Sequence, residues 1–278
     1  MAESQERAEA TPEIKTVELP NRVRLEYIEQ GDPSGVPVLL LHGITDSWRS
    51  FERVLPHLPD SVHAFALSQR GHGDSDRPAS GYRPRDFAAD LEAFVDALGL
   101  GPAVIAGHSM GSTVAQRFAI DHPERVLGLV LIGSVTTWRG HPDFVELWDT
   151  TVSTLEDPVD PDFVREFQES TLAQPVPPEF VDTVVRESLK LPARVWKAAL
   201  REGLLQDDFS GELGEIKAPT LIVWGDRDEL TGSHQEPLAA AIAGSRRVVY
   251  PGAGHGLHWE EPAHFAADLA TFVEETAS

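Results

Sequence analysis

A short apolar stretch that ends in a Gly-x-Ser-x-Gly turn constrains the fold of this chain more than any other feature. The stretch occupies residues 102–111, PAVIAGHSMG, and residues 113–120 follow at once with apolar side chains at helical spacing. Such a succession predicts a strand, a tight turn and a helix, with Ser109 at the apex of the turn. Gly107 and Gly111 carry no Cβ, so the strand and the helix can close against each other around a strained serine. The turn therefore predicts a nucleophile whose Oγ points outward.

A serine hydroxyl needs two further groups before it can attack at neutral pH. A histidine must take its proton, and a carboxylate must fix the tautomer of that histidine and stabilise the imidazolium. Both occur downstream: residues 220–228, TLIVWGDRD, end an apolar run with Asp226 and Asp228, and residues 251–256, PGAGHG, contain His255. Because open parallel sheets gather their ligands at the carboxyl ends of the strands, we expect these side chains to lie near the serine.

Other apolar runs predict a sheet whose strands alternate with helices. Residues 14–19 and 22–28 alternate apolar and polar side chains around Pro20 and Asn21, which indicates an antiparallel hairpin at one edge of the sheet. Further strands are predicted at residues 37–41, 62–67, 126–132, 220–224 and 247–250, and helices at 47–58, 85–98 and 262–275. This alternation predicts βαβ units and a largely parallel sheet.

The alternation of strands and helices stops between residues 134 and 212. The helix-like patches of this segment lie at residues 142–154, 162–172, 178–189 and 193–203. We interpret residues 134–212 as a helical lid inserted into a core of residues 14–133 and 213–278, and residues 1–13 as a disordered tail. Trp138, Trp148 and Trp196 are predicted to line an apolar substrate pocket under this lid, although packing onto the core would also explain them.

Charge and hydropathy exclude several classes of partner. The 278 residues carry a formal net charge of −22, which repels nucleic acid and anionic membrane surfaces. The longest apolar runs are too short to cross a bilayer, and residues 1–13 contain no apolar segment typical of a signal peptide, so a cytoplasmic location is expected. The chain has no cysteine, which excludes disulfides and thiolate chemistry.

Five short motifs together give the chain a resemblance to a known family. They are HGI at residues 42–44, RGHGDS at 70–75, GHSMG at 107–111, GDRD at 225–228 and GAGH at 252–255. As a set they resemble the α/β-hydrolase fold with an inserted lid, in particular its serine esterases and lactonases. The resemblance implies a mostly parallel central sheet that is flanked by helices.

Carried over by position, the resemblance implies a catalytic triad in the order Ser, Asp, His. Ser109 is then the nucleophile, His255 the base and Asp228 the orienting acid. Asp226 stands two residues before the acid and remains the less favoured alternative for its role.

The same resemblance implies an oxyanion hole made of backbone N–H groups. One N–H belongs to Met110, which begins the predicted helix, and the other to Ile44, the residue after the His-Gly pair. The chain departs from the family at Ser68, where most relatives carry an aspartate, and at Gly232, where a proline is usual.

The resemblance implies a serine hydrolase that cleaves carboxylic esters or lactones of small, largely apolar molecules through an acyl-enzyme intermediate. It implies no cofactor, a small-molecule partner, and neither nucleic acid nor membrane, and it leaves a homo-oligomer open. Epoxide and haloalkane hydrolysis in this fold use an aspartate where this chain has Ser109. A hydrolase of carbon–carbon bonds, a cofactor-free perhydrolase and a small-ligand signalling receptor that retains the triad remain as alternatives.

The remaining histidines are given structural interpretations. We expect His42 to support the oxyanion loop, His108 to fill a variable position of the turn, and His258 to lie at a pocket edge or on the surface. Polar surface or turn positions are expected for His72, His122 and His234. His255 and His258 are spaced like metal ligands, but no third ligand accompanies them, so no metal site is predicted.

Overall fold

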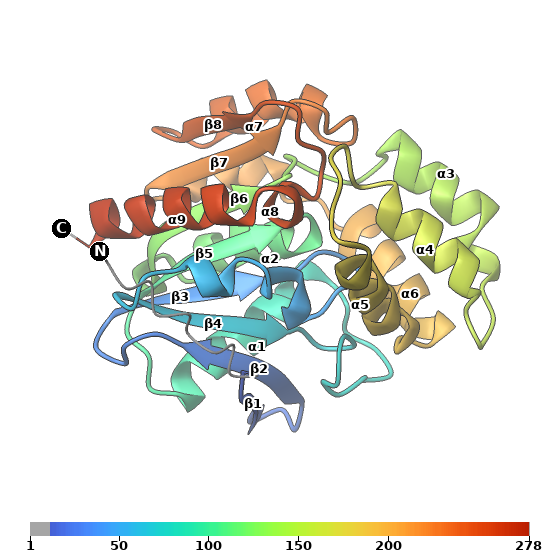
Figure 1. Ribbon diagram of the computed structural model, residues 1–278, viewed down its shortest axis with the longest axis horizontal. Helices are drawn as coiled ribbons and strands as arrows, with labels where there is room; N and C mark the ends of the chain where they lie inside the picture. Colours follow the sequence, from blue (N-terminus) through green and yellow to red (C-terminus); the bar gives the residue numbers. More distant parts are fainter. Residues whose placement is uncertain (1–11, 278) are drawn as a thin grey trace, which may run out of the picture.

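Within residues 12–277, which this computed structural model describes, eight strands form one sheet in the order β1-β2-β4-β3-β5-β6-β7-β8 (Figure 1). The strands are Ile14–Glu18 (β1), Arg24–Gln30 (β2), Val36–Leu41 (β3), Val62–Ser68 (β4), Ala103–His108 (β5), Val126–Ile132 (β6), Thr220–Gly225 (β7) and Arg246–Tyr250 (β8). β2 pairs antiparallel with β1 and with β4, and the other neighbouring strands pair parallel. The predicted edge hairpin and the largely parallel sheet are therefore confirmed.

Helices cover both faces of the sheet. They are Pro84–Ala97 (α1), Met110–Asp121 (α2), Gln235–Ala241 (α7), Leu257–Glu260 (α8) and Pro262–Thr276 (α9). Short 3-10 helices lie at Trp48–Phe51, Leu55–His57, Pro123–Arg125, Ser210–Glu215 and Gly232–His234. Helices α1 and α2 pack on one face, and α8 and α9 pack on the other (Figure 1).

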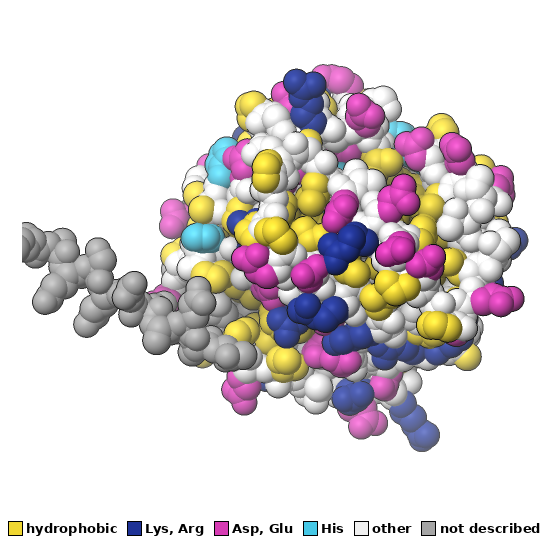
Figure 2. Space-filling model, turned by 45° about the vertical axis from the view of Figure 1, so that its right-hand side comes forward, with side chains coloured by type: hydrophobic (Ala, Val, Ile, Leu, Met, Phe, Trp, Pro, Cys, Tyr) yellow, Lys and Arg dark blue, Asp and Glu magenta, His cyan; other side chains and the backbone are white. Residues whose placement is uncertain are grey.

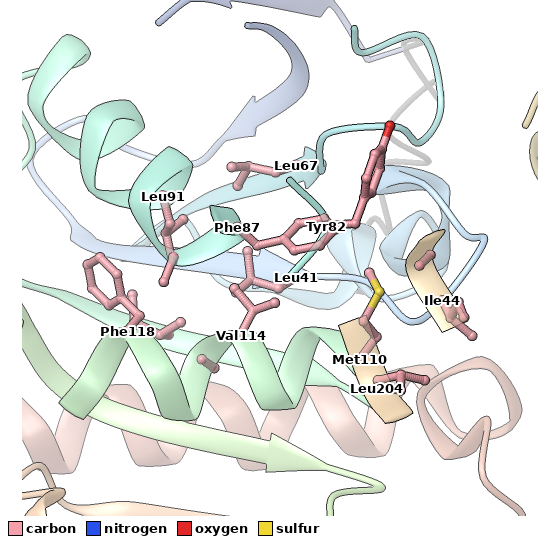
Figure 3. Packing of buried hydrophobic residues seen from close by; sticks show 14 of the residues in the cluster. Leu41, Ile44, Leu67, Tyr82, Phe87, Leu91, Met110, Val114, Phe118 and Leu204 are labelled. Atoms are coloured by element: carbon pink, nitrogen blue, oxygen red, sulfur yellow. The ribbon is translucent and has the colours of Figure 1, made fainter. Parts of the chain in front are cut away.

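The apolar strands are buried on both sides because successive side chains point to opposite faces. In β3, Leu39 and Leu41 join the core that contains Phe87 of α1. Figure 3 shows Leu41 and Phe87 packed together in this core with side chains of α2. Val38 and Leu40 point the other way and join the core beneath α9. A strand of this kind needs apolar residues at every position, which is the pattern that the sequence shows.

Four helices lie between β6 and β7, in the segment that the sequence analysis assigns to a lid. They are Pro142–Thr150 (α3), Pro161–Glu169 (α4), Pro178–Leu189 (α5) and Ala193–Leu200 (α6), and a single π-helical segment, Arg201–Gln206, follows. α3, α4 and α5 begin with a proline, which suits the first helical position because no N–H is needed there. Figure 1 shows the four helices together beyond the carboxyl ends of β3 and β5. We call residues 134–212 the helical insertion.

The predicted disordered tail, residues 1–13, lies outside the described residues except for its last two positions. In the described part of the chain, no helix combines the length and the apolar character needed to cross a membrane.

Candidate active site

Ser109 occupies a strained turn between β5 and α2. Its φ of 51° and ψ of −114° lie in a region that residues with a side chain rarely adopt. The two glycines of the motif are required by close packing: a Cβ on Gly107 would lie 2.2 Å from the carbonyl oxygen of Gly111, and a Cβ on Gly111 would lie 2.3 Å from that of Leu41. The Ser109 N–H is held by Ile132 O at 3.0 Å, which fixes the turn onto the neighbouring strand.

His255 and Asp228 form a buried pair. His255 Nδ1 donates to Asp228 Oδ2 at 2.8 Å, and the two side chains are 5% and 1% exposed. Asp228 also accepts from the Thr231 hydroxyl and from the N–H groups of Leu230 and Thr231. Burial raises the pKa of Asp228, but the nearby His255 charge and these hydrogen bonds outweigh it, so the pKa lies below its ordinary value. The carboxylate is therefore ionised and fixes the histidine with Nε2 free to accept a proton.

Gly133 makes room for this pair. Its φ is +52°, and a Cβ on it would lie 2.8 Å from His255 Nδ1. The residue directly follows β6, which lies next to the strand that carries the turn of Ser109, so the histidine can reach the serine side of the sheet. The sequence analysis missed Gly133, and a glycine directly after an apolar strand was the signal that could have found it.

Asp226 lies in a different environment from Asp228. Its Oδ1 accepts the Gly252 N–H at 2.7 Å, its side chain is 42% exposed, and Arg227 lies 4.0 Å away. The structure thus brings Asp228, rather than Asp226, to His255, and Asp226 braces the turn that precedes the histidine.

The backbone groups predicted for the oxyanion hole lie at a helix start and in a loop. Met110 begins α2, so its N–H is one of the four that have no partner within the helix. Ile44 follows Gly43 and lines a cavity together with Ser109. Figure 3 shows the side chains of Ile44 and Met110 at the same end of the core.

His42 supports this loop. Its Nδ1 donates to Gly43 O at 2.7 Å, and its Nε2 accepts the Gln69 N–H at 3.0 Å. Burial lowers the pKa of His42 well below 6.5, so the ring is neutral and can make both bonds. The geometry agrees with the supporting role that the sequence analysis gives to His42.

A cavity of about 370 Å³ lies over Ser109 and His255. Its walls come from the core and from the helical insertion, and they include Ile44, Phe144, Leu147, Phe163, Phe167, Leu230 and Trp259. Among the described residues that line it there is no Lys or Arg, whereas Asp143 and Glu166 stand exposed at its rim. On the face that Figure 2 turns forward, hydrophobic side chains show between acidic and basic ones. The cavity therefore offers an apolar space without a cation to pair with an anionic group.

The three tryptophans predicted to line the pocket do not line this cavity. Trp138 donates to Thr113 Oγ1 at 3.0 Å and packs behind Phe144 at a ring distance of 4.8 Å. Trp196 packs behind Phe163 and Phe167, each at 5.5 Å. The Arg201 guanidinium covers the ring of Trp148 at 5.1 Å. The buried indole N–H of Trp138 needs a partner, which it finds in the core, and the phenylalanines in front present the apolar wall.

The expectation for His258 is wrong, and that for His72 holds only in part. His258 was expected at a pocket edge or on the surface, but it is fully buried and does not line the cavity. His72 lies in a turn between Gln69 and Ser75, as expected, but it is fully buried as well. His72 Nδ1 donates to Arg70 O at 2.8 Å, and His258 Nε2 lies 3.1 Å from Ser50 Oγ. Burial lowers the pKa of His72 to about 4 and that of His258 to about 3, so both rings are neutral. The partly exposed His122 and His234 fit the surface and turn positions expected of them.

The structure explains how a serine fits at position 68, where the chain departs from the family pattern. Ser68 Oγ donates to Glu26 Oε2 at 2.8 Å and accepts the Trp48 N–H at 3.2 Å. Ser68 thus links this strand end to a buried carboxylate, that of Glu26 in the neighbouring β2.

The sequence analysis also missed two polar residues of the cavity. Asp46, two residues after Ile44, and Gln168, in α4, both line it, and they are 3% and 2% exposed. The proximity of Asp46 to the His-Gly pair was a usable signal. No sequence pattern identified Gln168, because its partner is 122 residues away.

The chain is similar in sequence and in fold to known enzymes. The sequence model of the alpha/beta hydrolase fold matches residues 36–262. A 2-(acetamidomethylene)succinate hydrolase of Mesorhizobium japonicum is 26% identical over 91% of this chain and 92% of its own length. Epoxide hydrolase 3 of Xenopus tropicalis is 25% identical over 91% of this chain and 75% of its own. The solved structure of an esterase from Exiguobacterium antarcticum, 23% identical, has a TM-score of 0.83 over 94% of this chain and 99% of its own, a similarity of fold.

Proposed function

This chain belongs to the α/β-hydrolase family of enzymes, and we propose that it is a serine hydrolase that cleaves carboxylic esters or lactones of small, largely apolar molecules. The observation that carries the proposal is the buried pair of His255 and Asp228, joined at 2.8 Å, whose histidine lines one cavity with the strained Ser109. A serine at this turn distinguishes the chain from enzymes of the fold that attack with an aspartate.

The chemistry follows from these groups. His255 Nε2 removes the proton of Ser109 Oγ as the oxygen forms a bond to the carbonyl carbon of the substrate. The N–H groups of Met110 and Ile44 stabilise the oxyanion that develops on the carbonyl oxygen. His255 then gives the proton to the leaving alcohol, and the acyl group stays on Ser109. A water molecule, deprotonated by His255, attacks the acyl-enzyme and releases the acid, while Asp228 stays ionised throughout.

The cavity supports an uncharged acyl group. Apolar side chains such as Phe144 and Phe167 form its wall, and the only charged side chains among its described lining residues, other than the histidines, are carboxylates. A carboxylate on the substrate would lose its hydration without gaining a cationic partner, which is costly. The Mesorhizobium relative is named for a succinate substrate, so we propose that this chain takes a different substrate class.

A labelling and substrate comparison tests the proposal. A fluorophosphonate is expected to label Ser109 stoichiometrically, and Ser109→Ala is expected to remove labelling and to lower kcat by several orders of magnitude with the fold intact. p-Nitrophenyl butyrate and the p-nitrophenyl monoester of succinic acid have similar size and differ in one carboxylate. The neutral ester should have a kcat/KM at least about tenfold higher. Equal activity of Ser109→Ala would overturn the serine mechanism, and a preference for the succinate ester would overturn the substrate class.

A further inference from the structure

The loop that carries Ile44 is strained and needs to be held. Thr45 has φ +66°, a left-handed conformation that is uncommon for any residue other than glycine and costly for a β-branched one. Asp46 follows, and its N–H reaches Gly43 O at 3.4 Å to close the turn. The Asp46 side chain is buried and lines the same cavity as Ser109.

A buried polar network ties this loop to the helical insertion. Gln168 of α4 donates from Nε2 to Asp46 Oδ1 at 3.0 Å and to Ser188 Oγ at 2.8 Å. Ser188 of α5 in turn donates to the carbonyl oxygen of Thr45 at 3.1 Å. The side chains of Thr45 and Ser188 are 0% exposed, and that of Gln168 is 2% exposed. Two helices of the insertion, α4 and α5, therefore hold the residues that directly follow Ile44.

No Lys or Arg pairs with Asp46 in the part of the chain that the structure describes. Gln168 donates to it from the insertion, and Ser50 Oγ lies 3.5 Å from its Oδ2. Two histidines are its titratable neighbours: the charge of His255 acts on it, and His108 Nδ1 and Asp46 Oδ2 would lie 2.9 and 3.1 Å from a Cβ on Gly43. The guanidinium of Arg49 forms ion pairs with Glu52 at 2.8 Å and with Glu187 at 3.6 Å, and not with Asp46.

Burial of the Asp46 carboxyl group is the largest effect on its pKa and raises it to about 7. The hydrogen bond from Gln168 and the charge of His255 act in the opposite direction and lower the pKa. At neutral pH a large share of Asp46 is thus uncharged.

We propose that Asp46 is a positioning residue that works as an uncharged acid, held by Gln168, to fix the oxyanion loop of Ile44. The inference rests on the serine-hydrolase function proposed above. Ionisation of Asp46 places a negative charge in the cavity where the oxyanion develops, and like charges repel strongly where water is excluded. The insertion thereby contributes to transition-state stabilisation as well as to the cavity wall.

Two groups, His255 and Asp46, determine how the rate of the Ser109 reaction depends on pH. His255 acts as the base and accepts the Ser109 proton, and the rate falls with rising pH as Asp46 loses its proton. With a pKa of about 7, the protonated fraction of Asp46 falls from about one half at pH 7 to about one hundredth at pH 9. The reaction of Ser109 is therefore expected to slow about fiftyfold over that range.

The test measures the second-order rate constant for phosphonylation of Ser109 by a fluorophosphonate between pH 6 and pH 9.5. This probe uses the same oxyanion hole and requires no knowledge of the natural substrate. In Asp46→Asn, which is isosteric and uncharged, the descending limb should vanish, with the rate at pH 9 within about twofold of its own value at pH 7. Gln168→Leu removes a hydrogen bond that favours the ionised acid, so the limb should move to higher pH by about one unit and the rate at pH 7 should fall at least about tenfold.

Gln174→Leu is the matched control. Gln174 also joins the insertion to the core, through Glu261 at 3.0 Å, but it does not line the cavity. Gln174→Leu should keep the native pH profile. The thermal unfolding midpoint of each variant shows whether that variant folds. An unchanged descending limb in Asp46→Asn, with Ser109 still labelled, overturns the role of Asp46 and leaves the hydrolase standing. No labelling of the native chain at any pH overturns both proposals.

Discussion

Asp228 Oδ2 accepts a hydrogen bond from His255 Nδ1 at 2.8 Å across 27 residues of sequence, whereas Asp226 faces solvent. We expect Asp228→Asn to lower kcat/KM for a neutral aryl ester by about three to four orders of magnitude, because the amide cannot stabilise the imidazolium. Asp226→Asn, which keeps a partner for the Gly252 N–H, should cost less than about threefold. Steady-state kinetics of both variants decide the matter, and the reverse order of effects would move the acid to Asp226.

The turn of Ser109 gives a prediction on stability. Gly107→Ala would place a Cβ 2.2 Å from the Gly111 carbonyl oxygen, and neither backbone can yield without moving β5 or α2. We expect a loss of about 3 kcal/mol or more in the free energy of unfolding, or no folded protein. Gly101→Ala is the control, since no atom lies within 4 Å of its Cβ. Urea denaturation measures both, and equal stability of the two variants would contradict the close packing seen here.

The buried histidines predict a loss of stability in acid. His42, His72, His108 and His258 are held neutral by burial, with pKa values of about 4 for His72 and about 3 for His258. In the unfolded chain a histidine binds a proton below about pH 6.5, so between about pH 6.5 and 4 the unfolded state binds more protons. Each such histidine lowers the free energy of unfolding by about 1.4 kcal/mol per pH unit of acidification in that window. Asp46, whose folded pKa is raised, acts in the opposite direction between about pH 4 and 7.

Urea unfolding at half-unit steps from pH 5 to pH 7 checks this prediction. His72→Asn keeps a donor near Arg70 O but cannot bind the proton. The slope of its free energy of unfolding against pH should therefore be smaller than that of the native protein by the equivalent of about one proton. Gly101→Ala, which changes no titratable group and whose Cβ would meet no atom within 4 Å, should leave the slope unchanged. Identical slopes for native protein and His72→Asn would show that His72 titrates normally when folded.

The sequence predicted the sheet well because the central strands β3, β5 and β6 are apolar along most of their length. Leu39 and Val38 point to different faces, and both faces are covered, so the runs stand out in the sequence. Two core helices, α7 and α8, were not predicted, because they span only 7 and 4 residues and are too short to show a helical period.

The candidate site was predicted only where a local pattern marks a residue. Ser109, Asp228 and His255 each follow a strand within a recognisable motif, and the structure brings the last two into contact. The burial of His258 depends on Ser50, 208 residues away, and no local pattern reports such a partner. The cavity wall was misassigned for a similar reason: size favoured the tryptophans, but the orientation of each helix decides which aromatic ring faces the cavity.

The wall of the cavity gives the last prediction, which concerns acyl-chain length. Phe144 of α3 lies in the wall, and Trp138 packs behind it. Removal of the phenyl ring opens space into which a longer acyl chain can extend, and each buried methylene adds about 0.8 kcal/mol, or about fourfold in kcat/KM.

We therefore expect Phe144→Ala to move the optimum of a p-nitrophenyl ester series from acetate to decanoate toward longer chains, by at least two carbons. Short esters should lose kcat/KM in the same variant, because they no longer fill the space against Ser109 and water remains in the cavity. Val145→Ala, on the adjacent and exposed residue of the same helix, should leave the series unchanged. If Phe144→Ala and Val145→Ala give the same profile as the native protein, the acyl group does not contact α3, and the wall that selects the substrate has to be sought at Ile44, Leu230 and Trp259 on the core side.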